Sequence, residues 1–131
     1  NPTGDMMKIA FAGPASNLLL AFITLLLSSL SFIDINNTVV KSFYTINLAL
    51  SVFNLLPISP LDGSQIFNPI ILRYNKKAGI FLNTYGSQIL LGLILFGIFT
   101  GHSILWKMIF PIMTFINTIF LFIVNLIAWK K

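Results

Sequence analysis

The charged residues divide this sequence into four long apolar stretches, and this division limits what the chain can fold into. The stretches cover residues 9–33, 42–61, 78–106 and 108–129, and each has at least 20 residues without a charge. About 20 helical residues cross the hydrocarbon core of a bilayer, which is roughly 30 Å thick. Only 8% of the residues are charged, against about 25% in soluble domains. The sequence therefore predicts an all-α integral membrane protein.

We expect one transmembrane domain over residues 1–131, with the lipid bilayer as its first partner. Its spanning helices, about four in number, are predicted at about residues 14–33, 42–61, 79–101 and 108–129. The chain opens on Asn1 rather than Met, and no signal-peptide pattern follows. We therefore expect the domain to be the C-terminal part of a larger membrane protein.

Prolines predict breaks in the first two helices. Proline is favoured at the first position of a helix, so the pair Gly13-Pro14 predicts that the first helix begins at this proline. Residues 9–13 would then enter the helix as an extended segment. In Pro57–Pro60, each proline disfavours helical torsions in the residue before it. The backbone is therefore expected to be irregular just before Asp62.

The few charges favour one orientation and no nucleic-acid partner. The net charge is +5, but the cations are scattered between apolar stretches and form no phosphate-binding face. The loop Arg73–Lys77 lies between two expected helices, and Lys130 and Lys131 end the chain. The positive-inside rule places this loop and both chain ends in the cytoplasm, and Gly101–Ser103 on the opposite side of the cell membrane.

Polar residues gather on the second expected helix. Asn47, Ser51 and Asn54 are four and three residues apart, so they share one helix face. A polar stripe in a transmembrane helix normally faces the interior of the bundle, where it makes interhelical hydrogen bonds. Here the stripe also leads directly into the break before Asp62, so a functional role is the alternative.

Asp62 is the residue for which the sequence suggests chemistry most directly. A carboxylate near a membrane core costs several kcal/mol and marks function by default. The structural alternative is a helix cap, because Asp62 followed by Gln65 resembles a capping box. The residues alone leave both interpretations open.

Two elements resemble one protein family. Residues 54–63, N-L-L-P-I-S-P-L-D-G, resemble the N-x-x-P-x-x-x-x-D-G signature of the site-2 proteases, which are intramembrane zinc metalloproteases. Residues 13–17, G-P-A-S-N, resemble the G-P-x-x-N element that opens an earlier helix in that family. The stretch with Tyr85-Gly86 is similar to the shorter bacterial members, which lack a PDZ insert.

The resemblance implies a Zn²⁺ cofactor and roles for individual residues. Asp62 corresponds to the zinc-ligating aspartate of the family. The residues that correspond to the substrate-positioning segment are Asn54, Pro57, Pro60 and Gly63. The residues that correspond to the structural G-P-x-x-N element are Gly13, Pro14 and Asn17.

The implied activity is hydrolysis of peptide bonds within transmembrane segments of other membrane proteins. In the family, zinc is also held by two histidines of an H-E-x-x-H helix, whose glutamate is the general base. This chain contains no H-E-x-x-H, no Glu and one His. It therefore holds no catalytic residue, and by itself we expect it to bind zinc weakly, to be inactive and to expose its polar stripe. Its expected partners are transmembrane substrates and an N-terminal segment that carries the motif.

His102 is not expected to replace the missing ligands. The predicted topology places it in a loop on the outer side, away from Asp62. Two other functions stay open: a non-catalytic pseudoprotease or assembly subunit, and, less favoured, a small transporter subunit with an ion site at the broken helix.

Overall fold

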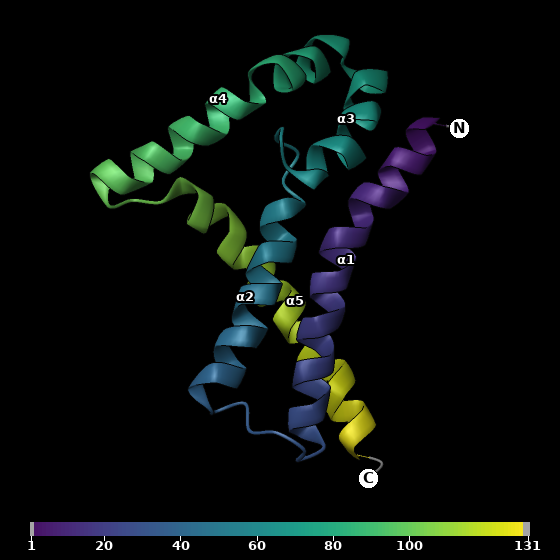
Figure 1. Cartoon of the computed structure of the whole chain (residues 1–131), viewed down its shortest axis with the longest axis vertical. Helices are drawn as coiled ribbons and strands as arrows, with labels where there is room; N and C mark the ends of the chain where they lie inside the picture. The colour runs from purple at the N-terminus through teal and green to yellow at the C-terminus, as the bar shows by residue number, and fades with distance from the viewer. Residues whose placement is uncertain (1, 130–131) are drawn as a thin grey trace.

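Within residues 2–129, which the computed structural model describes, every regular element is a helix (Figure 1). The five helices are α1 (Pro2–Ser29), α2 (Thr38–Asn54), α3 (Asp62–Tyr74), α4 (Lys76–Thr100) and α5 (Ile104–Trp129). Three of them, α1 from Gly4 onward, α4 and α5, are long and apolar enough to cross a membrane. The predicted all-α membrane fold is confirmed.

The second expected span, residues 42–61, is not a single helix. α2 has 17 residues, or about 25 Å at 1.5 Å per residue, which is short of a bilayer core of roughly 30 Å. Residues 55–61, called the bend segment below, are not helical, and the 13-residue α3 follows them. The break predicted at Pro57–Pro60 is therefore confirmed, and it divides this part of the chain into two short helices.

The predicted break at Gly13-Pro14 is wrong, because α1 runs through this pair without interruption. The extended segment expected at residues 9–13 is helical as well. The helix begins instead at Pro2, and Asp5 in its first turn complements the helix dipole. A proline does stand at the first position of this helix, but it is Pro2 and not the predicted Pro14.

Asparagine side chains cap the N-termini of α2 and α4. The Asn37 side chain accepts hydrogen bonds from the N–H groups of Val39 and Val40, at 2.9 and 3.3 Å, and so caps α2. The Asn75 side chain accepts one from the Ala78 N–H at 3.1 Å and caps α4. These bonds satisfy N–H groups that have no partner within the helix.

α1 and α2 pack side by side over the largest contact in the fold, and α5 contacts both (Figure 1). α4 extends away from this pair and is attached through α3 at one end and α5 at the other. The Tyr44 hydroxyl donates a hydrogen bond to Asn117 Oδ1, which joins α2 to α5. Large apolar side chains such as Phe99 and Phe115 are exposed, as expected for surfaces that face lipid.

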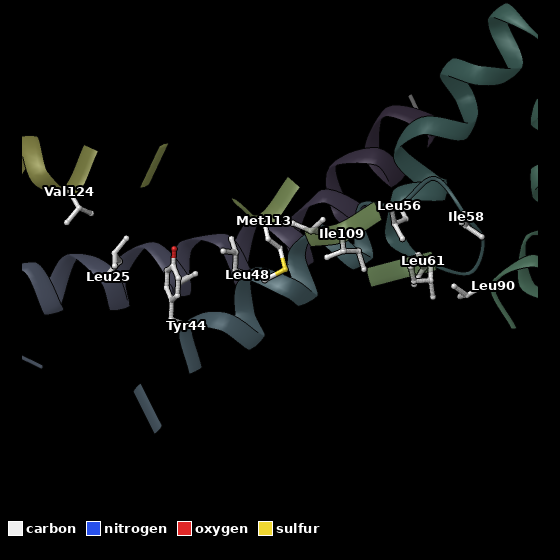
Figure 2. Close-up of a cluster of buried hydrophobic side chains, with 13 residues drawn as sticks. Leu25, Tyr44, Leu48, Leu56, Ile58, Leu61, Leu90, Ile109, Met113 and Val124 are labelled. Carbon is white, nitrogen blue, oxygen red and sulfur yellow. The ribbon is translucent and has the colours of Figure 1, made fainter. Parts of the chain in front are cut away.

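The buried apolar residues form one elongated cluster (Figure 2). Its labelled members are Leu25, Tyr44, Leu48, Leu56, Ile58, Leu61, Leu90, Ile109, Met113 and Val124. Leu56, Ile58 and Leu61 belong to the bend segment, so this non-helical stretch is anchored in the core. Leu90 brings α4 to the same end of the cluster (Figure 2).

The polar stripe of α2 is inside the fold, as the sequence predicted. Asn47 and Ser51 are buried, and each donates to a carbonyl of its own helix, Phe43 O at 2.8 Å and Leu48 O at 2.7 Å. The expectation that these two residues make interhelical hydrogen bonds is therefore wrong, as is the expectation that they are exposed. The carbonyls of α2 itself accept the hydrogen bonds of the two side chains.

Candidate metal and substrate site

The bend segment leaves backbone groups free at the point where α2 ends. The Leu56 N–H still bonds to Phe53 O at 3.1 Å, and the Leu61 N–H bonds to Ile58 O at 2.9 Å. Between them, Pro57 and Pro60 have no N–H to donate. Among the described residues, nothing accepts a hydrogen bond from the N–H of Ile58 or Ser59. The segment therefore combines a fixed shape with unused hydrogen-bonding groups.

The side chains of the bend segment divide between the core and the surface. Leu56, Ile58 and Leu61 are buried, whereas Pro57 and Pro60 are exposed. Two of the predicted substrate-positioning residues thus lie on the accessible side of the segment. Asn54, a third, ends α2 and is partly buried.

Gly63, the fourth predicted substrate-positioning residue, is buried in the first turn of α3, against the start of the bend segment. A Cβ at Gly63 would lie 2.2 Å from the carbonyl oxygens of both Leu55 and Leu56. Real Cβ atoms essentially never come so close to another heavy atom. The absence of a side chain at Gly63 therefore lets the first turn of α3 pack directly on the backbone of the bend segment.

Asp62 is the first residue of α3, and the capping interpretation of it is wrong. The N-cap position is occupied by Leu61, in an extended conformation, and no side chain makes a cap hydrogen bond there. The Asp62 carboxylate is only partly buried, and no hydrogen bond or ion pair to it exists among the described residues. Its negative charge is favourable at a helix N-terminus, and its oxygens remain free to bind a ligand.

Gly13 faces this carboxylate from α1. A Cβ at Gly13 would lie 3.0 Å from Asp62 Oδ2, and no other atom outside its own helix turn is comparably close. The adjacent Pro14 is fully buried, and Asn17 is partly buried one turn further along. Residues 13–17 and 54–63, the two elements that carry the family resemblance, therefore meet in space, and the Asp62 carboxylate lies at their contact.

Other predicted features do not join this site. His102 lies in the exposed loop between α4 and α5, where its N–H bonds to Thr100 Oγ1 at 3.2 Å. Within residues 2–129, no group of three or more His, Cys, Asp or Glu side chains could hold a metal. Asp62 is thus a single candidate ligand in this part of the chain.

Two cavities flank the bend segment and the start of α3. The larger, about 390 Å³, is almost wholly apolar and lies between α2, α3 and Ile112 of α5, with Pro57 in its wall. The smaller, about 230 Å³, is more polar and is lined by residues of α1, α3 and α4, among them Ser64, Gln65 and Asn83. An extended apolar peptide near Pro57 would find room for a side chain in the larger cavity.

Sequence reasoning gave no role to Gly86, although Tyr85-Gly86 belongs to the family resemblance. Gly86 is buried on α4 against Ser59 of the bend segment. A buried glycine within a largely exposed transmembrane helix indicates a close helix contact. Its partner, however, lies in a non-helical segment that no periodicity could have identified.

Comparison with known proteins places the chain in a family of peptidases. Residues 28–97 match the sequence profile of peptidase family M50. "Zinc metalloprotease MJ0392" of Methanocaldococcus jannaschii is 33% identical over 79% of this chain and 32% of its own length. "Putative zinc metalloprotease YwhC" of Bacillus subtilis is 33% identical over 77% of this chain and 50% of its own length. The chain thus spans about a third to a half of the length of these relatives. No solved structure matches.

Proposed function

Because the chain belongs to peptidase family M50, the site-2 protease family, we propose that it is the C-terminal part of an intramembrane zinc endopeptidase. In this proposal Asp62 is a zinc ligand, and the bend segment positions a transmembrane segment of a substrate protein. The observation that supports it best is the unpaired Asp62 carboxylate, against which Gly13 of α1 packs.

The surroundings of Asp62 fit a metal ligand. Its carboxylate has no competing partner, and the absent side chain at Gly13 leaves α1 close to Oδ2 without blocking it. Carboxylate oxygen is a normal zinc ligand, but a catalytic zinc needs about three protein ligands. We propose that the other two come from an H-E-x-x-H helix outside residues 1–131. When bound, zinc lowers the pKa of a coordinated water to about 7 and polarises a carbonyl.

The bend segment suits an extended peptide. A substrate that unwinds for cleavage needs hydrogen-bond partners for its own backbone. The carbonyls of the exposed residues Pro57 and Pro60, which accept no hydrogen bond among the described residues, can supply them. The apolar cavity at Pro57 would receive an apolar side chain of the kind that transmembrane segments carry. Asn54 and Asp62 flank this segment, so the substrate would lie between the end of α2 and the metal ligand.

The direct test compares residues 1–131 with the complete protein. Residues 1–131 are expected to hold little zinc and to cleave nothing, because one carboxylate cannot retain a catalytic zinc. Co-expression with an upstream segment that contains H-E-x-x-H should restore about one zinc per chain and cleavage of a transmembrane substrate. Stoichiometric zinc and cleavage from residues 1–131 alone would refute the proposed division of the site. An upstream sequence without the motif would favour a non-catalytic relative.

We further propose that the α3–α4 loop faces the cytoplasm, on the basis of Arg73, Lys76 and Lys77. Cysteines at Tyr74 and His102 can test this, because both side chains are exposed. Residues 1–131 contain no cysteine of their own. A membrane-impermeant thiol reagent on intact cells should therefore label His102→Cys and not Tyr74→Cys. The reverse pattern would show that the orientation is inverted.

A further inference from the structure

Gly86 of α4 is in close contact with the backbone of the bend segment. A Cβ at Gly86 would lie 2.8 Å from Ser59 N, 2.9 Å from Ser59 Cβ and 3.1 Å from Ser59 O. Two of these atoms belong to the main chain, so they cannot move aside by a change of rotamer. Any side chain at this position must displace either α4 or the bend segment.

The contact continues along the same face of α4. Leu90, one turn after Gly86, is buried in the cluster that also contains Ile58 and Leu61 (Figure 2). α4 therefore covers the side of the bend segment on which Ser59 lies. Pro57 and Pro60 remain exposed, so α4 leaves their side of the segment open to a substrate.

Gly92 provides a contrast within the same helix. It is exposed, and a Cβ built on it would have no neighbour within 4 Å. The close approach at Gly86 is therefore a property of that position and not of glycine in α4 generally.

We propose that Gly86 is a positioning residue of the peptidase. Because Gly86 has no side chain, α4 packs directly against the Ser59 peptide unit, and this contact holds the bend segment in the conformation that receives the substrate. This inference rests on the proposed function, because it concerns the substrate-positioning segment of the same site. Gly86 acts through Ser59 and touches neither the substrate nor the metal ligand.

Gly86→Ala is expected to impair substrate positioning more than metal binding. Misplacement of a positioning group by about 1 Å can cost about 100-fold in rate, so we expect kcat/KM to fall at least about tenfold. Asp62 also has supports that do not involve α4 directly, because Gly63 packs on the Leu55 and Leu56 carbonyls and Gly13 approaches from α1. Zinc content should therefore stay within about twofold of the wild-type value, a smaller change than loss of a supporting contact to a metal ligand would cause.

The experiment measures zinc content, kcat and KM for cleavage of a transmembrane substrate, and the thermal midpoint. It uses the complete protein as wild type, Gly86→Ala, Gly92→Ala, and Gly86→Ala combined with Ser59→Gly. The last variant removes the Ser59 Cβ that would lie 2.9 Å from the new methyl group, and it should recover part of the lost activity. Gly92→Ala should behave as the wild type.

The possible outcomes separate the two proposals. A wild-type protein without zinc and cleavage would refute the proposed function and this inference together. An active wild type with equal activity in Gly86→Ala would refute the inference alone. Parallel loss of zinc, folding and activity in both Gly86 variants would show that Gly86 only supports packing, and would also overturn the inference.

Discussion

Asp62→Ala is expected to abolish proteolysis by the complete protein and to weaken its zinc binding. We expect a loss greater than the 10–100-fold typical of residues that merely support a metal ligand. The fold should largely survive, because the carboxylate has no hydrogen-bond partner in the described chain to lose. Removing its favourable charge from the start of α3 costs only about 0.3–1 kcal/mol. Metal analysis, cleavage assays and thermal unfolding of the purified variant measure the three effects separately.

The matched control for Asp62→Ala is Asp34→Ala. Asp34 is exposed in the loop between α1 and α2, where its side chain accepts a hydrogen bond from the Asn36 N–H at 2.9 Å. Its removal should leave zinc content and cleavage unchanged. Cleavage at the wild-type rate by Asp62→Ala would show that this carboxylate is not a zinc ligand.

Gly63→Ala is expected to destabilise the fold more than a methyl group added at any other glycine whose surroundings the structure describes. The new Cβ would overlap two carbonyl oxygens at 2.2 Å, which are main-chain atoms without rotamers. Overpacking of this kind costs about 1–3 kcal/mol, occasionally more, and we expect the free energy of unfolding to fall by at least about 2 kcal/mol. Unfolding in a denaturing detergent, followed by circular dichroism, measures the change.

Gly92→Ala is the control here too, because its new Cβ would have open space around it. Alanine favours a helix over glycine by about 1 kcal/mol, so this variant should be as stable as the wild type or slightly more stable. If Gly63→Ala unfolds at the wild-type detergent concentration, then α3 does not pack against the bend segment as closely as described.

Much of the fold follows from patterns that act locally along the chain. Charge-free stretches of spanning length predicted the long helices, and Pro57 and Pro60 predicted the break before Asp62, because proline restricts its own neighbours. A second local rule, the preference of proline for the first position of a helix, failed at Pro14. A proline within a helix removes one hydrogen bond without preventing the others, and the preceding turns, starting at Pro2, are helical as well.

The site was harder to predict, because its contacts join segments distant in sequence. Asp62 could be singled out as a carboxylate in an apolar stretch, but the local pattern could not exclude a cap. Only the fold places Leu61 at the cap position and Gly13 against the carboxylate. The close packing of Gly63 and Gly86 could not be predicted for the same reason, because a glycine in a sequence does not reveal which atoms lie beside it in the fold.

The uneven packing along α4 also bears on how the sequence of this protein can evolve. Near its start, α4 packs closely on other segments, at Gly79 against Leu72 and at Gly86 against Ser59. Around Gly92, the same helix has open space and exposed apolar neighbours such as Leu91. Mutations that enlarge residues 79 or 86 require a compensating change elsewhere, whereas those at residue 92 need only remain compatible with lipid. Substitutions should therefore be rarer at residues 79 and 86 than at residue 92 and its exposed neighbours.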